Sequence, residues 1–254
     1  MCLVTGAGRG IGREIALRMA SEGAAVAVDD IDLETAKEVA QRICDEGGNA
    51  FGIQADVSRD ADASRLVEET YSRLGRLDIL VNNAGVDLVA APKDTGVDEW
   101  QRMLAVDLSG AFLCAKYSEE HLARDRSGVI VNISSIHASA TLPGRAAYAS
   151  AKAGLTGLTR ALALDLGPRG IRVNAILPGY IRTEMWSLWL DSVPDRDGLV
   201  KRIADQHPLR RIGTPGDIAG VVAFLASEDA AFISGAMLVV DGGFTVMFQP
   251  PPMS

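Results

Sequence analysis

Short apolar runs alternate with longer amphipathic segments along almost the whole chain. The apolar runs are continuously hydrophobic and end in Gly, Asn, Asp or Ser, as buried strands do. The longer segments repeat their apolar positions every three to four residues, which is the period of a helix packed on one side. The pattern predicts strands at residues 2–6, 24–28, 50–57, 77–85, 128–135, 171–179 and 236–243, and helices at residues 11–22, 33–46, 61–74, 97–124, 145–166 and 216–226.

This alternation predicts the fold class. Strands that are apolar on both faces and are separated by helices belong to a parallel sheet covered on both sides. We therefore expect an α/β, doubly wound parallel sheet of the Rossmann type, in a single domain over residues 1–254. The least regular stretch is residues 183–208, and the tail at 248–254 reads as extended. Ligands of such sheets bind at the carboxyl ends of the strands, so the chemistry should lie in the strand-to-helix turns.

Composition and charge narrow the class further. The chain is 48% hydrophobic and 23% charged, and no apolar run approaches the length of a membrane span. The N-terminus does not resemble a signal peptide, so we expect a cytoplasmic protein. A net charge of -8 argues against nucleic acid or an anionic membrane as the partner. Cys2, Cys44 and Cys114 form no CxxC pair or metal-ligand cluster, so no metal is expected.

A glycine-rich turn follows the first predicted strand. It reads TGAGRGIG at residues 5–12, with glycines at 6, 8, 10 and 12. Glycine is needed where backbone turns tightly and approaches a pyrophosphate, which then rests on the N-terminus of the next helix. The spacing is not the literal GxGxxG, and the Lys-Ser/Thr of a P-loop is missing, which argues against a nucleoside triphosphate. A purely structural glycine turn is the alternative.

An acidic cluster ends the second predicted strand. Asp30 lies 18 residues beyond Gly12, where a carboxylate can accept hydrogen bonds from the ribose hydroxyls of a dinucleotide. The same carboxylate repels a 2'-phosphate, and Asp29 and Asp32 add to the effect. The sequence therefore favours NAD over NADP, with a solvated acidic turn as the alternative.

Tyr148 and Lys152 lie four residues apart in the predicted helix over residues 145–166, within the stretch RAAYASAKAGL. That spacing places both side chains on one helical face, so the ammonium can lie beside the phenol. A phenol ordinarily has a pKa of about 10 and is a poor base at pH 7, but a nearby cation favours its ionised form. The pair alone is a weak motif, because it can arise by chance.

Eight short motifs occur in the order found in the short-chain dehydrogenase/reductase family, which the chain resembles over nearly its whole length. They are TGAGRGIG (5–12), the acidic strand end (Asp30), DV (56–57), NNAG (82–85), SS (134–135), YASAK (148–152), PG (178–179) and DGG (241–243). Each motif is weak alone, and the ordered set is specific.

The resemblance implies an NAD-dependent oxidoreductase that interconverts a secondary alcohol and its carbonyl by hydride transfer. It implies that Ser135 holds the reacting oxygen, that Tyr148 is the general base and that Lys152 supports it, while Ser134 is structural. Asp56 would accept from the adenine amino group, and Ile181 and Thr183 would contact the nicotinamide carboxamide. The implied cofactor-binding residues are Gly6, Arg9, Gly10, Ile11, Gly12, Asp30, Asp56, Val57, Asn83, Ala84, Gly85, Tyr148, Lys152, Pro178, Gly179, Ile181 and Thr183.

Asp107 departs from the family pattern. The family usually has Asn in this segment, here VDLSG, where it helps hold a water chain to the lysine. Asp keeps the acceptor but loses the amide donor, and an ionised Asp adds negative charge near Lys152. We count Asp107 among the catalytic residues and expect a changed proton relay rather than a lost activity.

Two features bear on the substrate. His137 follows Ser135 by two residues, as in relatives that oxidise sugars or 3-hydroxybutyrate, and its imidazole could bind a polar group; a plain loop histidine is the alternative. Trp186 and Trp189 lie in residues 183–208, where the family places a substrate lid; they suit a sugar ring or simple packing. His121 and His207 read as surface residues.

The first candidate substrate is therefore a sugar such as an aldose. The alternatives are a 3-hydroxyacyl, 3-hydroxybutyrate or hydroxysteroid substrate, 3-oxoacyl reduction, or a non-catalytic dinucleotide sensor. The small residues lining the helix at 145–166 permit close helix packing, and relatives pair this helix across subunits, so we expect a homo-oligomer, either a tetramer or a dimer.

Overall fold

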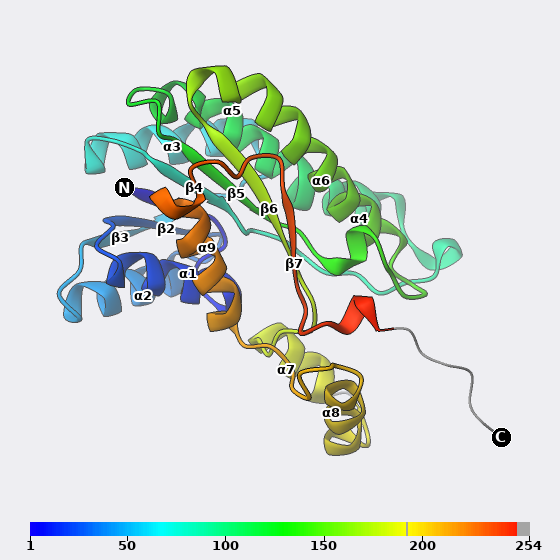
Figure 1. The fold of residues 1–254 in the computed structure, drawn as a ribbon. Coiled ribbons are helices and arrows are strands. Elements are labelled where there is room, and N and C mark those ends of the chain that lie inside the picture. The colour runs from blue at the N-terminus through cyan, green and yellow to red at the C-terminus, as the bar shows by residue number, and fades with distance from the viewer. Residues whose placement is uncertain (192, 248–254) are drawn as a thin grey trace.

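The chain folds around one sheet of parallel strands (Figure 1). A computed structural model describes residues 1–191 and 193–247, except for the side chains of residues 185, 188 and 189. Within these residues the sheet has seven strands in the order β3-β2-β1-β4-β5-β6-β7. The strands are β1 (Cys2–Val4), β2 (Val26–Asp30), β3 (Ala50–Gln54), β4 (Ile79–Asn82), β5 (Val129–Ile133), β6 (Arg172–Pro178) and β7 (Met237–Val240). The predicted doubly wound α/β fold is confirmed.

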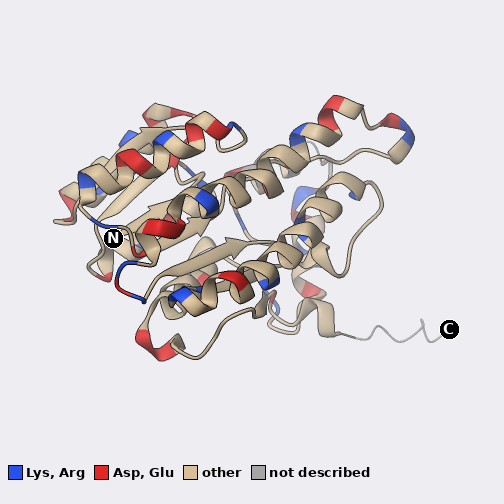
Figure 2. Cartoon of the chain, turned by 90° about the horizontal axis from the view of Figure 1, so that it is seen from above, with Lys and Arg blue, Asp and Glu red and all other residues tan. Residues whose placement is uncertain are grey.

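Helices cover both faces of this sheet. On one face lie α1 (Gly10–Ser21), α2 (Leu33–Asp45) and α9 (Pro215–Ala226), and on the other lie α3 (Asp60–Leu74), α4 (Val97–Leu104), α5 (Gly110–Leu122) and α6 (Ala146–Leu166) (Figure 1). The short helices α7 (Glu184–Asp191) and α8 (Arg196–Asp205) lie beyond one end of the strands. Charged residues of both signs follow the flanking helices, whereas the strands carry few (Figure 2).

The alternation of side chains along each strand builds two cores. In β1, Cys2 and Val4 join the core under α1, α2 and α9, whereas Leu3 between them joins the core under α3 and α5. The register aligns Leu3 with Ala27 of β2 and with Leu80 of β4, and all three side chains are fully buried. This two-sided burial is why the strands read as continuous apolar runs.

The predicted helix over residues 97–124 is not a single regular helix. Its first part, α4, passes into a π-helical turn at Ala105–Ser109 before α5 begins at Gly110. Such a turn inserts one extra residue into a helix and is common at functional sites. Here it carries Asp107, whose Oδ1 accepts from the backbone N–H of Val86 at 2.8 Å.

The interpretation of His207 as a surface residue is wrong, because its exposed fraction is 1%. Its Nδ1 lies 2.7 Å from the Ile203 carbonyl, and its ring packs against Tyr180 and Phe244. His121 is also mostly covered, with its side chain 13% exposed and its ring stacked on Tyr71.

Residues 183–208 form more regular structure than their sequence suggests, because they contain α7 and α8. Trp186, Leu190, Ile203 and Ile212 make a small apolar cluster of their own. The side chain of Trp189 and the tail at 248–254 lie outside the described residues.

None of the helices that the structure describes is long and apolar enough to cross a membrane. Cys2 and Cys114 are buried and Cys44 is exposed, all three as free thiols. Among the described residues there is no cluster of three or more His, Cys, Asp or Glu side chains that could hold a metal ion.

Candidate active site

The turns that follow six of the strands, β1 to β6, border one cavity of about 640 Å³. It brings together every residue predicted for the site except Gly12 and Trp189: Gly6, Arg9, Gly10, Ile11, Asp30, Asp56, Val57, Asn83, Ala84, Gly85, Asp107, Ser135, His137, Tyr148, Lys152, Pro178, Gly179, Ile181, Thr183 and Trp186. Gly12 lies behind the cavity wall, where it packs against Gly6 and Asn83. Trp189 has no described side chain.

The glycine turn after β1 forms a cradle that side chains would fill. Gly6 and Gly10 have φ angles of +60° and +58°, which favour glycine. A Cβ on Gly6 would lie 2.7 Å from Ala84 Cα, and one on Gly12 would lie 2.3 Å from the Gly6 carbonyl oxygen. The turn therefore keeps bare backbone at the N-terminus of α1, which fits the pyrophosphate of a dinucleotide.

Asn83 holds this cradle against the neighbouring turn. Its Nδ2 donates to the carbonyls of Thr5 and Gly6 at 3.0 and 2.8 Å, and its backbone N–H donates to Thr5 Oγ1 at 3.0 Å. The Asn of the NNAG motif thus joins the turn after β1 to the turn after β4.

Two carboxyl groups at the end of β2 lie in different surroundings. Asp30 Oδ2 accepts from Gly8 N–H at 2.9 Å, so this carboxylate faces the glycine cradle. Asp29 points to the opposite face of the sheet, is 1% exposed, and its Oδ1 has no hydrogen-bond partner among the described residues. Burial, helped by the charge of Asp30, raises the pKa of Asp29 well above its usual range; the Gly6 and Ala55 N–H groups and Arg65 offset this only partly.

Ser135, Tyr148 and Lys152 meet at the other end of the cavity. Ser135 follows β5, and its Oγ accepts from the His137 N–H at 3.2 Å. Lys152 Nζ donates to the Ile133 carbonyl at 3.2 Å and lies 5.6 Å from the centre of the Tyr148 ring. Ser134 Oγ donates to the Lys152 carbonyl at 3.0 Å, which ties β5 to α6.

Asp107 and Lys152 form a buried ion pair. Asp107 Oδ2 lies 3.1 Å from Lys152 Nζ, and the two side chains are 0% and 5% exposed. Burial by itself lowers the pKa of Lys152, but the Asp107 carboxylate, together with Tyr148, outweighs it and the net shift is upward. The lysine therefore stays charged, and its field on Tyr148 is partly neutralised by Asp107.

A group of polar side chains that sequence reasoning did not assign lines the cavity beside Tyr148. Arg145 at the start of α6 donates through Nη1 to Asp87 Oδ1, and Arg102 of α4 also lines the cavity. His137 lies edge-on to the Tyr148 ring at 5.6 Å, and burial, with Arg145, lowers its pKa. The sequence signal for the Arg145–Asp87 pair is its closeness to two family motifs, since Asp87 lies two residues after NNAG and Arg145 three residues before YASAK.

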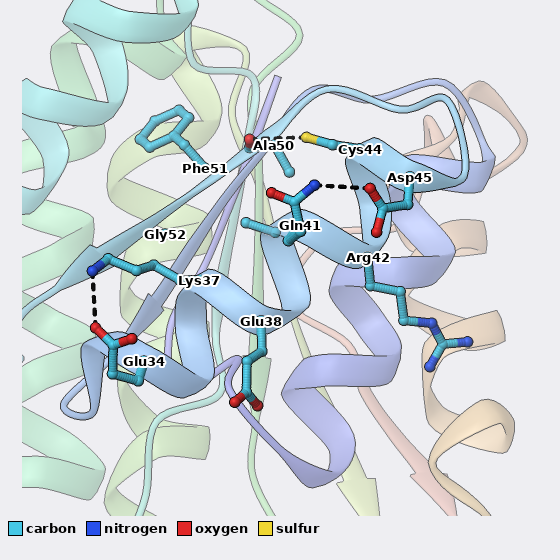
Figure 3. Close-up of a pocket in the computed structure, with 11 residues that line it drawn as sticks. Glu34, Lys37, Glu38, Gln41, Arg42, Cys44, Asp45, Ala50, Phe51 and Gly52 are labelled. Carbon is cyan, nitrogen blue, oxygen red and sulfur yellow. Dashed lines mark hydrogen bonds and ion pairs between the residues drawn. The ribbon is translucent and has the colours of Figure 1, made fainter.

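A second hollow lies on the surface between α2 and β3 (Figure 3). Its polar side chains mostly pair with one another: Lys37 Nζ with Glu34 at 2.8 Å, Gln41 Nε2 with Asp45 at 2.8 Å, and Cys44 Sγ with the Ala50 carbonyl at 3.4 Å. This groove therefore offers little unpaired chemistry, in contrast to the cavity at the strand ends.

The fold and the cavity together define a Rossmann-type oxidoreductase that uses a nicotinamide dinucleotide. A family model described as enoyl-(acyl carrier protein) reductase matches residues 6–245. The meso-2,3-butanediol dehydrogenase of Serratia marcescens is 39% identical over 249 residues, covering 98% of this chain and 96% of that protein. A 3-oxoacyl-(acyl-carrier-protein) reductase of Staphylococcus epidermidis is 40% identical over 245 residues, covering 95% and 97%.

A solved structure of a relative has the same fold. A double mutant of a Serratia marcescens short-chain dehydrogenase/reductase superposes with a TM-score of 0.88 at 39% identity, over 96% of this chain and 97% of that one. The chain belongs to the short-chain dehydrogenase/reductase family.

The raised pKa of Asp29 predicts how stability depends on pH. The folded chain keeps a proton on this carboxyl at pH values where the unfolded chain has released it, so the stability contribution of Asp29 falls as the pH rises above about 3.8. Asp29→Asn, which does not ionise, should exceed the wild type in Tm at pH 8 by about 2–4 °C, with a smaller gain at pH 5. Thermal scans without cofactor measure this, with the exposed Asp45→Asn on α2 as control. An identical pH slope in wild type and Asp29→Asn would contradict it.

The Asp107–Lys152 pair predicts the pH profile of catalysis. Asp107→Asn removes the charge that raises the pKa of Lys152 and leaves the remaining lysine charge uncompensated beside Tyr148. Both effects should move the kcat/KM profile for alcohol oxidation to lower pH, by about one unit. The exposed Asp98→Asn on α4 is the control, and a profile unchanged in Asp107→Asn would refute the coupling.

Proposed function

We propose that the protein is an NAD-dependent oxidoreductase that interconverts a small polar secondary alcohol and its carbonyl by hydride transfer. The observation that carries this proposal is the single cavity that runs from the glycine cradle at Gly6 and Gly10 to Ser135, Tyr148 and Lys152. The cavity therefore has room at one end for a dinucleotide and a proton-transferring group at the other. The cytoplasmic location expected above stays part of the proposal.

The residues around Tyr148 account for the proton and oxygen chemistry. The bound dinucleotide supplies or accepts the hydride. Ser135 Oγ already accepts from His137 N–H, so its own hydroxyl hydrogen is free to donate to the substrate oxygen. Tyr148 removes the proton of the alcohol in oxidation and returns it in reduction. Lys152 donates one of its three N–H groups to the Ile133 carbonyl and forms an ion pair with Asp107, and a remaining N–H donor can bind the nicotinamide ribose.

The preference for NAD rests on the charges around the end of β2. Asp30 accepts from the backbone N–H of Gly8 and, at 3.1 Å, from that of Asp32, so its carboxylate is held beside the cradle. Arg9 could otherwise attract a 2'-phosphate, but its Nη2 lies 3.7 Å from Asp32 Oδ2. The carboxylates thus repel the additional phosphate of NADP and neutralise the nearest guanidinium.

The lining beside Tyr148 supports a small polar substrate. Arg145, Asp87 and His137 place polar groups close to Tyr148 that a small polar substrate can contact. Of the substrate classes expected from the sequence, an aldose and a short hydroxy acid such as 3-hydroxybutyrate fit this lining best. The Serratia relative, named for a small diol, agrees with this choice.

Residues 183–208 are proposed as a substrate lid within a single-domain enzyme. Trp186 lines the cavity and packs against Tyr180 at 5.5 Å, so this segment closes one side of the site. Assembly is proposed through α5 and α6, because Phe112 and Leu164 are 47% and 78% exposed on these helices. A homotetramer or a dimer would cover them.

Tyr148→Phe tests the function directly. Without the phenolic oxygen the alcohol proton has no acceptor, so kcat should fall by more than tenfold, a loss above about 1.4 kcal/mol, while NAD binding stays nearly unchanged. Absorbance at 340 nm measures turnover, and titration of NAD measures binding. Tyr117→Phe, at a half-buried tyrosine on α5 away from the cavity, is the matched control. A Tyr148→Phe enzyme that keeps more than about a tenth of kcat would mean that another group is the base.

Asp30→Asn tests the cofactor preference. The substitution keeps the size and an acceptor for the Gly8 N–H but removes the negative charge that repels a 2'-phosphate. The ratio of kcat/KM for NAD to that for NADP should fall at least about tenfold. The exposed Asp45→Asn on α2 should keep the wild-type ratio. If Asp30→Asn keeps it too, another group selects the cofactor.

A further inference from the structure

Arg145 and Asp87 form an ion pair in the cavity beside Tyr148. Lys152, the other cation next to Tyr148, is paired with the buried Asp107. An anion that binds beside Tyr148 would therefore meet the guanidinium of Arg145.

Arg145 has hydrogen-bond donors left for such an anion. Its side chain is 19% exposed, and one nitrogen, Nη1, donates to Asp87. A guanidinium has five N–H donors in a planar fork that matches a carboxylate, so the contact with Asp87 leaves donors for a second partner. Burial of the stem holds the group at the cavity wall and lowers the entropy lost when it binds.

The guanidinium also lies close to the reacting position. Arg145 is the N-cap residue of α6 and Tyr148 lies in the first turn of this helix, and Arg145 Cζ is 5.8 Å from the centre of the Tyr148 ring. Because carbon–carbon bonds are about 1.5 Å long, one short molecule can reach Tyr148 with its hydroxyl and Arg145 with an acid group.

We propose that Arg145 binds a carboxylate of the substrate, so the alcohol is a short hydroxy acid with its hydroxyl two or three carbons from the acid. The proposal rests on the function proposed above and names its substrate class. In oxidation the carbinol C–H bond breaks and hydride passes to NAD, the O–H proton passes to Tyr148, and a keto acid forms. The carboxylate takes no part in bond changes and serves to orient the carbinol carbon.

Asp87 has a defined part in this arrangement. It holds Arg145 at the wall in the absence of substrate, and its charge competes with the incoming carboxylate. Removal of that charge should therefore strengthen acid binding, whereas removal of Arg145 should weaken it. If the ion pair were purely structural, both substitutions would weaken acid binding, because each would harm the site in the same way.

The experiment compares a hydroxy acid with its neutral amide. 3-Hydroxybutyrate and 3-hydroxybutyramide, together with lactate and lactamide, present the same carbinol with and without a negative charge. The wild type with NAD should prefer the acid of at least one pair by about 10- to 100-fold in kcat/KM. Arg145→Gln should lose that preference through a higher KM for the acid, with kcat/KM for the amide changed less than about threefold. Arg145→Lys should restore part of it.

Asp87→Asn should change KM for the acid in the direction opposite to Arg145→Gln, and a substitution of a distant arginine is the control. Asp87→Asn should lower KM for the acid and leave the amide unchanged, while Arg42→Gln on α2 should match the wild type. Equal use of acid and amide by the wild type, or better use of neutral aldoses or 2,3-butanediol, overturns the carboxylate proposal and leaves the oxidoreductase function standing. Loss of acid and amide turnover alike in Arg145→Gln and Asp87→Asn also overturns it. No turnover of any alcohol by wild type that binds NAD overturns the proposed function as well.

Discussion

The pairing of β1 with β4 is the constraint on which the site depends. The chain runs outward from β1 to β2 and β3 and then returns to place β4 on the other side of β1. At this reversal the turns after β1 and β4 lead to helices on opposite faces, which opens a crevice between them. Thr5 N–H donates to the Val81 carbonyl at 3.0 Å, and Thr5 Oγ1 accepts from Asn83. The crevice is therefore closed at its base by hydrogen bonds, and only its upper part can receive a ligand.

A row of buried polar side chains connects that crevice to α6. Asn82 Nδ2 donates to Asn132 Oδ1 at 2.8 Å, and Asn132 Nδ2 donates to Thr159 Oγ1 at 2.9 Å. Thr159 lies two turns after Lys152 on the same face of the helix. Apolar packing alone would allow α6 to rotate by small amounts, whereas these directional bonds do not. The position of Tyr148 and Lys152 thus follows from side chains in the middle of the sheet, well away from the reacting atoms.

The sequence predicted the order of strands and helices, and the ordered motifs predicted which residues meet at the cavity. The hydrophobic period and the glycine positions depend on neighbouring residues only, so both can be recognised in the sequence without knowledge of the fold. The π-helical turn at 105–109 left no such signal, because it depends on Asp107 reaching Val86 and Lys152, which are distant in the chain. The burial of His207 was missed because the aromatic rings that cover it, Tyr180 and Phe244, come from separate turns. The Arg145–Asp87 pair was missed for the same reason.

The distribution of charge along the cavity bears on which ribose its acidic end can receive. Asp30 and Asp56 line one end, whereas Arg145 and Lys152 line the other, each in contact with one carboxylate. Ribose hydroxyls donate hydrogen bonds to carboxylates, but phosphates are repelled by them, so the acidic end suits a ribose with free hydroxyls and the glycine cradle suits the pyrophosphate. Discrimination between a ribose with free hydroxyls and one that carries a phosphate is a difference between two binding free energies. Unfavourable contacts with the wrong ligand contribute to that difference as well as favourable contacts with the right one.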